Sequence, residues 1–171
     1  MRAKHGLKPV PTYGFRPIMP ADLAMLNAWR REPHVAEWWG DDPFYREADL
    51  AEPRVAMRIV EADGVPFAFV QDYDVHGWEG HHFAHLPTGS RGMDQFIGPP
   101  SMIGRGHGPA FIALAVDELF AAGAPAVAVD PHPDNARAIA AYGKAGFVIA
   151  GKARETRWGT VLPMEAWRPS R

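Results

Sequence analysis

The sequence has no cysteine, so disulfide frameworks, thiolate metal sites and cysteine nucleophiles are all excluded. It also lacks an excess of charge of one sign: the net charge is −2, whereas a nucleic-acid-binding domain is usually basic. No apolar run approaches the length of about 20 residues that a membrane-spanning helix needs. We therefore expect a cytoplasmic protein that has neither nucleic acid nor a membrane as a partner.

The 171 residues are enough for one domain with a sizeable core, and 47% hydrophobic and 22% charged residues are ordinary for a globular protein. The first segment, 1–12, contains Arg2, Lys4 and Lys8 but no apolar core like that of a signal peptide. We interpret it as a flexible tail, with an ordered extra strand as the alternative. The remaining residues, 13–171, are expected to form a single domain.

Hydrophobic periodicity and turn residues predict an alternation of strands and helices. The predicted strands are 13–18, 55–61, 65–73, 92–97, 126–129, 147–150 and 161–167, and the predicted helices are 21–31, 45–51, 109–120 and 134–146. Asp63-Gly64 predicts a tight hairpin turn, and 37–43 and 74–90 are expected to be loops, the second one long enough to carry function. This order of elements predicts an α/β (α+β) fold with a mixed sheet.

The segment 103–108 reads Ile-Gly-Arg-Gly-His-Gly and immediately precedes a predicted helix. Its alternating glycines let the backbone run close to a ligand, and the helix directs free N–H groups and partial positive charge at the loop. Such an arrangement binds a phosphate or a diphosphate. The alternative is a glycine-rich turn that merely starts a helix.

Two well-known phosphate loops fit this segment poorly. A Walker-type loop needs Lys followed by Ser or Thr, and no such pair follows these glycines. A dinucleotide fingerprint needs a third glycine where this chain has Pro109, and it needs an acid on a following strand for the ribose. The loop alone therefore indicates a phosphate ligand without identifying it.

A second motif lies about thirty residues further on and follows the pattern N-x-x-A-x-x-x-Y-x-K-x-G-F. The residues that match it are Asn135, Ala138, Tyr142, Lys144, Gly146 and Phe147. With Gly106 and Gly108 in a loop of the form [QR]-x-x-G-x-[GA], the chain resembles the GCN5-related N-acetyltransferases (GNAT). Ile103 departs from the first position of that loop, where the side chain contributes less than the backbone amides.

Within this family the chain resembles the aminoglycoside 6'-N-acetyltransferases over nearly its whole length after Thr12. The likeness is most specific at Trp38-Trp39, at 91–95 and at 130–147. It implies the GNAT fold, in which helices flank a mixed, mostly antiparallel central sheet. It also implies acetyl-CoA as co-substrate, no metal, a small-molecule amine as acceptor, and a monomer or homodimer.

The resemblance further implies that coenzyme A lies along the strand before the glycine loop, the loop itself and the next helices. The residues expected to contact it are Gln95, Phe96, Ile97, Ile103, Gly104, Arg105, Gly106, His107, Gly108, Pro109, Asn135, Ala138, Tyr142 and Lys144. A backbone N–H of 95–97 is expected to stabilise the charge that develops on the thioester oxygen. Asn135 has an alternative role as the cap of its helix.

The implied reaction moves an acetyl group from acetyl-CoA to a primary amine, most specifically the 6'-amine of an aminoglycoside. The ammonium must lose a proton before it attacks, and a carboxylate in the pocket can hold the ammonium and accept that proton. Asp94 is the first candidate, with an ion pair to Arg91 as the alternative role. Tyr142 is the candidate that supplies a proton to the leaving thiolate, with a purely structural place in the core as the alternative.

Aromatic and acidic residues are expected to bind the acceptor. Trp38 and Trp39 are predicted to wall the pocket, with core packing as the alternative, which is expected for one of the two. Asp130, at the end of a buried strand, is predicted to bind a second ammonium or to cap the following turn. The histidines of 81–85 are interpreted as loop residues, because neither a cysteine partner nor an H-E-x-x-H pattern indicates a metal site.

Two features leave the acceptor open. His76 stands before Gly77-Trp78, where the best-known aminoglycoside enzymes have an acid, so the grip on a polycationic acceptor is weaker. Siderophore-type relatives typically have His where this chain has Asp94. The alternatives are a GNAT enzyme for another small-molecule or protein amine, siderophore-type precursors included, or a non-catalytic coenzyme A-binding protein.

Overall fold

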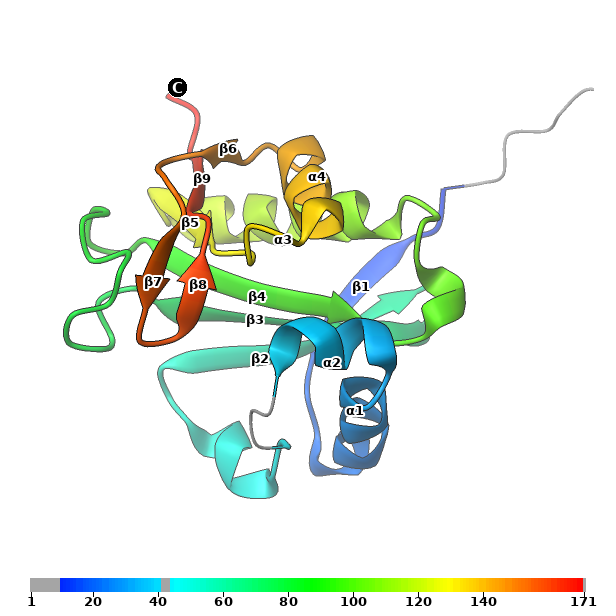
Figure 1. Cartoon of the computed structure of the whole chain (residues 1–171). Coiled ribbons are helices and arrows are strands. Elements are labelled where there is room, and N and C mark those ends of the chain that lie inside the picture. The colour runs from blue at the N-terminus through cyan, green and yellow to red at the C-terminus, as the bar shows by residue number, and fades with distance from the viewer. Residues whose placement is uncertain (1–9, 41–43, 171) are drawn as a thin grey trace, which may run out of the picture.

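The computed structural model describes residues 10–40 and 44–170, which form one large sheet, a small hairpin and the helices around them (Figure 1). The strands are β1 (Tyr13–Pro17), β2 (Val55–Ala62), β3 (Val65–Asp74), β4 (Arg91–Ile97), β5 (Ala126–Val129), β6 (Val148–Ile149), β7 (Arg154–Thr156), β8 (Gly159–Val161) and β9 (Met164–Trp167). The sheet has the order β1-β2-β3-β4-β5-β9-β6, and only β4 and β5 pair in parallel. The expected mixed, mostly antiparallel sheet is confirmed.

Helices cover both faces of this sheet, as Figure 1 shows. The helices are α1 (Leu23–Arg30), α2 (Pro33–Trp39), α3 (His107–Ala121) and α4 (Ala136–Lys144), and the 3-10 turns are η1 (Pro20–Asp22), η2 (Glu47–Ala51) and η3 (Pro100–Met102). Helices α3 and α4 lie on one face, and α1 and α2 lie on the other. The sheet is therefore covered on both sides, with a hydrophobic core under each pair of helices and a third, smaller cluster that includes Val75, Phe83 and Ala126.

The two cores arise from the period of two along each strand, since successive side chains point to opposite faces. Val60 and Val70 are buried in one cluster with Phe111 of α3. Their neighbours Ile59 and Phe69 are buried in the other cluster, which includes residues of α1 and α2. The same alternation on β4 sends consecutive residues of the candidate site to different faces.

Helix α2 replaces the first part of the loop that was expected at 37–43. Pro33 follows the end of α1, and it also occupies the first turn of α2. A proline is tolerated there because the N–H of a first-turn residue has no partner within the helix. Both tryptophans, Trp38 and Trp39, consequently lie on a helix, whereas 41–43 lie outside the described residues.

The C-terminal region also differs from the prediction. The strand expected at 161–167 is divided into β8 and β9, with Pro163 between them, because proline cannot donate to a sheet ladder. The hairpin of β7 and β8 was not predicted at all. The helix expected at 45–51 is the 3-10 helix η2.

The start of β1 is tied to the hairpin turn between β2 and β3. The Thr12 N–H donates to Asp63 Oδ1 at 2.9 Å, and the Asp63 N–H donates to the Thr12 carbonyl at 2.8 Å. Asp63 and Gly64 both have positive φ, at 51° and 78°, which confirms the predicted tight turn. Most of the expected flexible tail, residues 1–9, lies outside the described residues.

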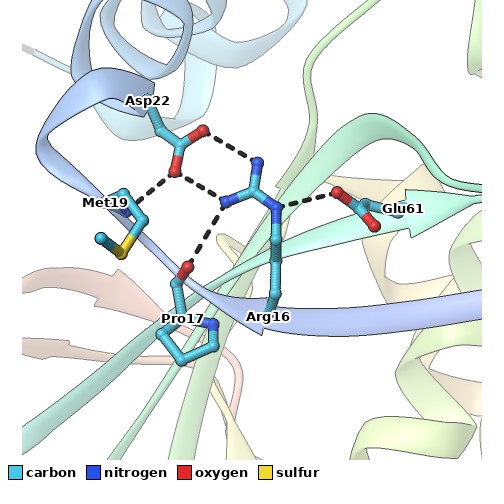
Figure 2. Close-up of polar contacts among 5 residues, drawn as sticks. All are labelled: Arg16, Pro17, Met19, Asp22 and Glu61. Carbon is cyan, nitrogen blue, oxygen red and sulfur yellow. Dashed lines mark hydrogen bonds and ion pairs between the residues drawn. The ribbon is translucent and has the colours of Figure 1, made fainter.

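Arg16 joins β1 to the turn that precedes α1 (Figure 2). Its Nη1 and Nη2 donate to the two carboxylate oxygens of Asp22 at 2.7 and 2.8 Å, and its Nε donates to Glu61 Oε1 at 2.8 Å. Asp22 Oδ2 also accepts the Met19 N–H at 2.8 Å. These bonds favour the charged carboxylate, and the Arg16 guanidinium in particular holds the pKa of Asp22 below its ordinary value.

We expect Asp22→Asn to lower the free energy of unfolding by about 1 kcal/mol at neutral pH, a value that allows for solvent screening around Arg16. Because the folded-state pKa of Asp22 is lowered, its contribution is present above the unfolded pKa of about 3.9 and is lost as the pH falls through the folded pKa. Urea unfolding at neutral pH and again in acid measures the difference, which should shrink on acidification.

Asp49 offers a matched control in the same local geometry. Its Oδ2 accepts the N–H of Arg46 at 2.7 Å, but the Arg46 side chain is 74% exposed and adds little. We expect Asp49→Asn to cost only a few tenths of a kcal/mol. Equal losses from Asp22→Asn and Asp49→Asn would contradict the role given to the Arg16 ion pair.

Candidate functional site

Two adjoining cavities lie where β4 and β5 separate. The larger cavity has a volume of about 690 Å³ and the smaller one about 340 Å³. The residues that line both are Trp38, Trp39, Gln95, Asn135, Ala138 and Tyr142. Ligands bound in the two cavities would therefore meet at this shared wall, which comes from α2, β4, and α4 with its N-cap residue.

The cavities exist because β4 and β5 pair only at their starts. Their parallel ladder joins Arg91 to Val127 and Gly92 to Ala128. Further along, residues of β4 line the smaller cavity, and the Ile97 carbonyl accepts a hydrogen bond from His34 Nε2 at 2.9 Å. A splayed strand offers its backbone groups to an extended, amide-rich ligand.

The glycine loop lies at the smaller cavity and leads into α3. Gly104 and Gly106 have φ of 73° and 85°, in the left-handed region that glycine adopts without a Cβ penalty. A Cβ at either position would meet no atom within 4 Å, and one at Gly108 would meet only Ile97 Cδ1 at 4.0 Å. The loop backbone thus faces open space at a helix N-terminus, an arrangement that suits a diphosphate.

Most residues that were predicted to contact coenzyme A line the smaller cavity. They are Gln95, Phe96, Ile97, Ile103, Gly104, Gly106, Gly108, Pro109, Asn135, Ala138, Tyr142 and Lys144. Arg105 and His107 do not line it. Arg105 is exposed, with its Nη1 3.9 Å from Met102 Sδ, and His107 Nδ1 lies 2.7 Å from the Tyr13 hydroxyl. His107 is thus bound to β1, and its ring also contacts Phe67.

Asn135, which was predicted to contact coenzyme A, also caps a helix. Its side-chain Oδ1 accepts the Ala138 N–H at 3.1 Å, so it caps α4, as the alternative interpretation predicted. Asn135 and Ala138 nevertheless line both cavities. The cap fixes the start of α4 at the shared wall.

Asp94 lies on β4 and lines the larger cavity. Its Oδ2 accepts a hydrogen bond at 2.9 Å from Nε2 of Gln71, the residue opposite it on β3. Arg91 instead donates from Nε and Nη2 to Asp72 Oδ2, at 2.9 and 2.7 Å. The predicted alternative, an ion pair between Asp94 and Arg91, is therefore replaced by an ion pair between Arg91 and Asp72.

Tyr142 lies on α4 at the shared wall and also belongs to the core cluster beneath α3. The amide Nε2 of Gln95 donates to its hydroxyl. Burial raises the pKa of Tyr142 well above its ordinary value, and the negative charges of Asp94 and Asp130 raise it further. The hydroxyl is consequently protonated at neutral pH, so it is suited to donate a proton and not to accept one.

The two tryptophans at the end of α2 differ in their surroundings. Trp39 packs edge-on against Phe96 and Phe69, with ring centroids 5.1 and 6.1 Å apart. Trp38 lies beside the ring of His132, with the centroids 5.8 Å apart. Both line the two cavities. Trp39 therefore packs against the core, as was expected for one of the pair, and it also lines the shared wall.

Asp130 follows β5 directly and also lines the larger cavity. Its Oδ2 lies 2.8 Å from Nε2 of His82, whose side chain is 7% exposed. His82 Nδ1 is buried and has no hydrogen-bond partner among the described residues. A hydrogen bond from Nε2 to Asp130 fits this arrangement, because a proton on Nδ1 would be buried without an acceptor. Asp130 Oδ2 then accepts this hydrogen bond.

The other histidines of the loop 74–90 have separate partners. His81 stacks on His82 with ring centroids 4.5 Å apart, and burial, followed by the nearby His82, lowers the pKa of His81 to about 4. His85 Nε2 lies 2.8 Å from Glu165 Oε1. Within residues 10–40 and 44–170, no group of three His, Cys, Asp or Glu side chains is placed to hold a metal ion.

Sequence reasoning missed one wall of the larger cavity, which is formed by the turn between β7 and β8. The Trp158 ring lies 4.6 Å from the His81 ring, and the Arg157 guanidinium carbon lies 4.0 Å from the Trp158 ring centroid. Gly159, with φ of 110°, is the sequence signal of this turn. The strands on either side have three residues each, which is too short for a clear alternation.

Comparison with known proteins identifies the family to which this chain belongs. The chain matches the acetyltransferase (GNAT) domain over residues 19–154. It is 34% identical over 144 residues to the aminoglycoside N(6')-acetyltransferase type 1 of Klebsiella pneumoniae, and the match covers 76% of this chain and 71% of that protein. A protein with the same description from Serratia marcescens gives the same values.

Solved structures show the same relationship. Aminoglycoside acetyltransferase AAC(6')-Ib in complex with coenzyme A superposes with a TM-score of 0.82 at 31% identity, covering 92% of this chain and 95% of that one. Its complex with coenzyme A and kanamycin gives 0.82 at 30% identity, with the same coverage. The expected GNAT fold is confirmed. The chain belongs to the GNAT acetyltransferase family, among the relatives of the aminoglycoside N(6')-acetyltransferases, and is an acetyl-CoA-dependent N-acetyltransferase.

Proposed function

We propose that the protein transfers the acetyl group of acetyl-CoA to the 6'-amine of an aminoglycoside. One observation carries this proposal: a cavity suited to a diphosphate and a cavity with two carboxylates share a wall that holds Gln95 and Tyr142. The relatives that were crystallised with coenzyme A and kanamycin support the same pair of ligands. Acetylation would remove the charge of one ammonium, and we propose antibiotic resistance as its consequence.

In this proposal the smaller cavity holds coenzyme A. The amides at 106–108 and the N-terminus of α3 bind the diphosphate, and the open edge of β4 binds the pantetheine arm. Bound in this way, acetyl-CoA supplies the acetyl thioester at the shared wall. A β4 backbone N–H near Gln95 serves as the donor for the carbonyl oxygen of that thioester.

Asp94 and Tyr142 divide the proton transfers between them. Asp94 holds the acceptor ammonium in the larger cavity and takes a proton from it, directly or through water. Tyr142 keeps its proton because burial raises its pKa, so its hydroxyl is the donor for the leaving sulfur. The two groups lie on different elements, β4 and α4, which meet only because β4 and β5 separate.

Asp130 and Trp38 orient the rest of the acceptor. Asp130 has a second oxygen, Oδ1, for an ammonium, while His82 holds its Oδ2. Trp38 offers an aromatic face beside the shared wall, to which a sugar ring or a cation binds. We propose that these groups position an aminoglycoside so that its 6'-amine reaches Asp94.

Release of free coenzyme A thiol tests the proposal directly. We expect the purified protein, given acetyl-CoA and kanamycin or tobramycin, to release thiol and to form a product that carries one acetyl group on the 6'-amine. A polyamine, a lysine-containing peptide and a hydroxylysine-type amine complete the panel. Thiol release in the presence of one of these amines, with none in the presence of the aminoglycosides, would reject the aminoglycoside as acceptor. The assignment as an N-acetyltransferase would still stand.

The location and assembly of the protein belong to the same proposal. No helix in the described parts of the chain is both long enough and apolar enough to cross a membrane. We propose a cytoplasmic enzyme that acts as a monomer or homodimer on a small-molecule amine and has no nucleic-acid or membrane partner.

A further inference from the structure

The larger cavity is lined by charged groups of both signs. Among the described residues, its lining contains two carboxylates, Asp94 and Asp130, and one guanidinium, that of Arg157. One of the carboxylates is already hydrogen bonded to His82. An acceptor with several ammonium groups would therefore meet a cation, Arg157, in the described wall of this cavity.

The position of Arg157 follows from the hairpin that carries it. The Trp158 ring lies 4.6 and 5.3 Å from the rings of His81 and His82, and the Arg157 guanidinium carbon lies 4.0 Å from the Trp158 ring centroid. The hairpin is held to the same loop by Arg154, whose Nη2 donates to the His82 carbonyl at 3.0 Å. Arg157 is also close enough to lower the pKa of His81, a smaller contribution than burial.

We propose that Arg157 is a specificity-determining residue that selects against acceptors with many ammonium groups. This inference rests on the proposed function and narrows it. The guanidinium repels every additional ammonium group on the acceptor, whereas an acceptor with the same reactive amine and no other cation is repelled only through that amine. The enzyme therefore acts best on aminoglycosides that carry few ammonium groups.

Two acceptors that share the reactive ring differ in the number of their other ammonium groups. Kanamycin presents its 6'-amine on a 6-amino-6-deoxyglucose ring and carries further ammonium groups, whereas methyl 6-amino-6-deoxyglucoside carries none besides the reactive amine. We expect Arg157→Gln to raise the ratio of kcat/KM for kanamycin to that for the glucoside about fivefold at low salt. The gain should shrink as ionic strength rises, because salt screens exposed charges.

Two control variants isolate the charge of Arg157. Arg157→Lys keeps the charge and should leave the ratio near that of the wild-type protein. Lys152→Gln removes the same charge from an exposed residue outside the cavity lining and should leave the ratio unchanged. Calorimetric dissociation constants of the two acceptors, measured with coenzyme A bound, provide the same ratio independently of turnover.

The outcomes separate this inference from the proposed function. If the wild-type protein releases thiol with neither acceptor, the proposed function fails and this inference falls with it. If both acceptors turn over but Arg157→Gln leaves their ratio unchanged, or changes both rates equally, the selectivity role is wrong and the proposed function stands. A rise of the kcat/KM ratio in the Arg157→Gln variant that is insensitive to salt would also overturn the electrostatic origin of the selectivity.

Discussion

Replacing Asp94 by asparagine is expected to lower kcat about 10³-fold, within the range of 10²–10⁴ that a positioned general base contributes. Asparagine keeps the size of the side chain and an oxygen that can accept from Gln71, but it cannot take a proton from the acceptor ammonium. Steady-state thiol release measures the loss. The affinity for coenzyme A should stay the same, because Asp94 lines only the larger cavity.

Asp74 supplies the matched control for this variant. It lies at the end of β3, lines neither cavity, and its Oδ1 accepts the His76 N–H at 2.9 Å. Asp74→Asn makes the same change of charge and should leave kcat within about twofold, as is usual for a surface site outside the machinery. If the Asp94→Asn protein kept nearly full kcat, Asp94 would not be the general base. That role would then belong to another group or to water.

The environment of Tyr142 supports the assignment of the general-base role to Asp94. A phenol accepts a proton only as phenolate, and burial together with the charges of Asp94 and Asp130 raises the pKa of Tyr142 far from neutrality. Gln95, which donates to the hydroxyl, opposes this shift but does not outweigh burial. The surroundings of Tyr142 thus keep its hydroxyl protonated, which suits this group to be the acid of the site and not the base.

The smaller cavity could be predicted well because its determinants are local in sequence. A glycine loop that opens a helix is recorded in consecutive residues, and so is the cap that Asn135 forms for α4. Two side chains within the loop are exceptions: His107 is directed to a distant partner, Tyr13, and Arg105 is exposed and turned to Met102. The backbone of the loop follows from its own residues, but the direction of its side chains does not.

The larger cavity was predicted only in part because its walls come from segments far apart in the chain. His82 binds Asp130 across 48 residues, and no local pattern indicates that pairing. The turn at Arg157 and Trp158 follows a strand of three residues, so periodicity gave no signal. Trp38 was identified through the family resemblance. Its place on a helix was not predicted, because Pro33 follows the end of one helix and also occupies the first turn of the next.

Replacing Gly108 by valine is expected to weaken coenzyme A binding about 100-fold, or about 2.8 kcal/mol, by blocking amide contacts to the diphosphate. Gly108 lies in the first turn of α3 and lines the smaller cavity, and a Cβ there meets only Ile97 Cδ1 at 4.0 Å. The fold therefore accommodates the side chain, which extends into the space assigned to the diphosphate. Isothermal titration with coenzyme A measures the loss.

Gly108 is a sharper test of this site than Gly106, although both belong to the family motif. Gly106 has φ of 85°, so any side chain there strains the backbone of the loop as well as entering the cavity. A loss of affinity in Gly106→Val would mix these two effects. Gly108, which lies in the helix and outside the left-handed region, separates them.

Gly143→Val completes the comparison. Gly143 lies in α4, is exposed and lines neither cavity, and a Cβ there meets no atom within 4 Å. The substitution should leave coenzyme A affinity unchanged and should not destabilise the helix, because glycine is the poorer helix former. If Gly108→Val bound coenzyme A as tightly as Gly143→Val, the diphosphate would lie elsewhere, and the assignment of the smaller cavity to the co-substrate would be wrong.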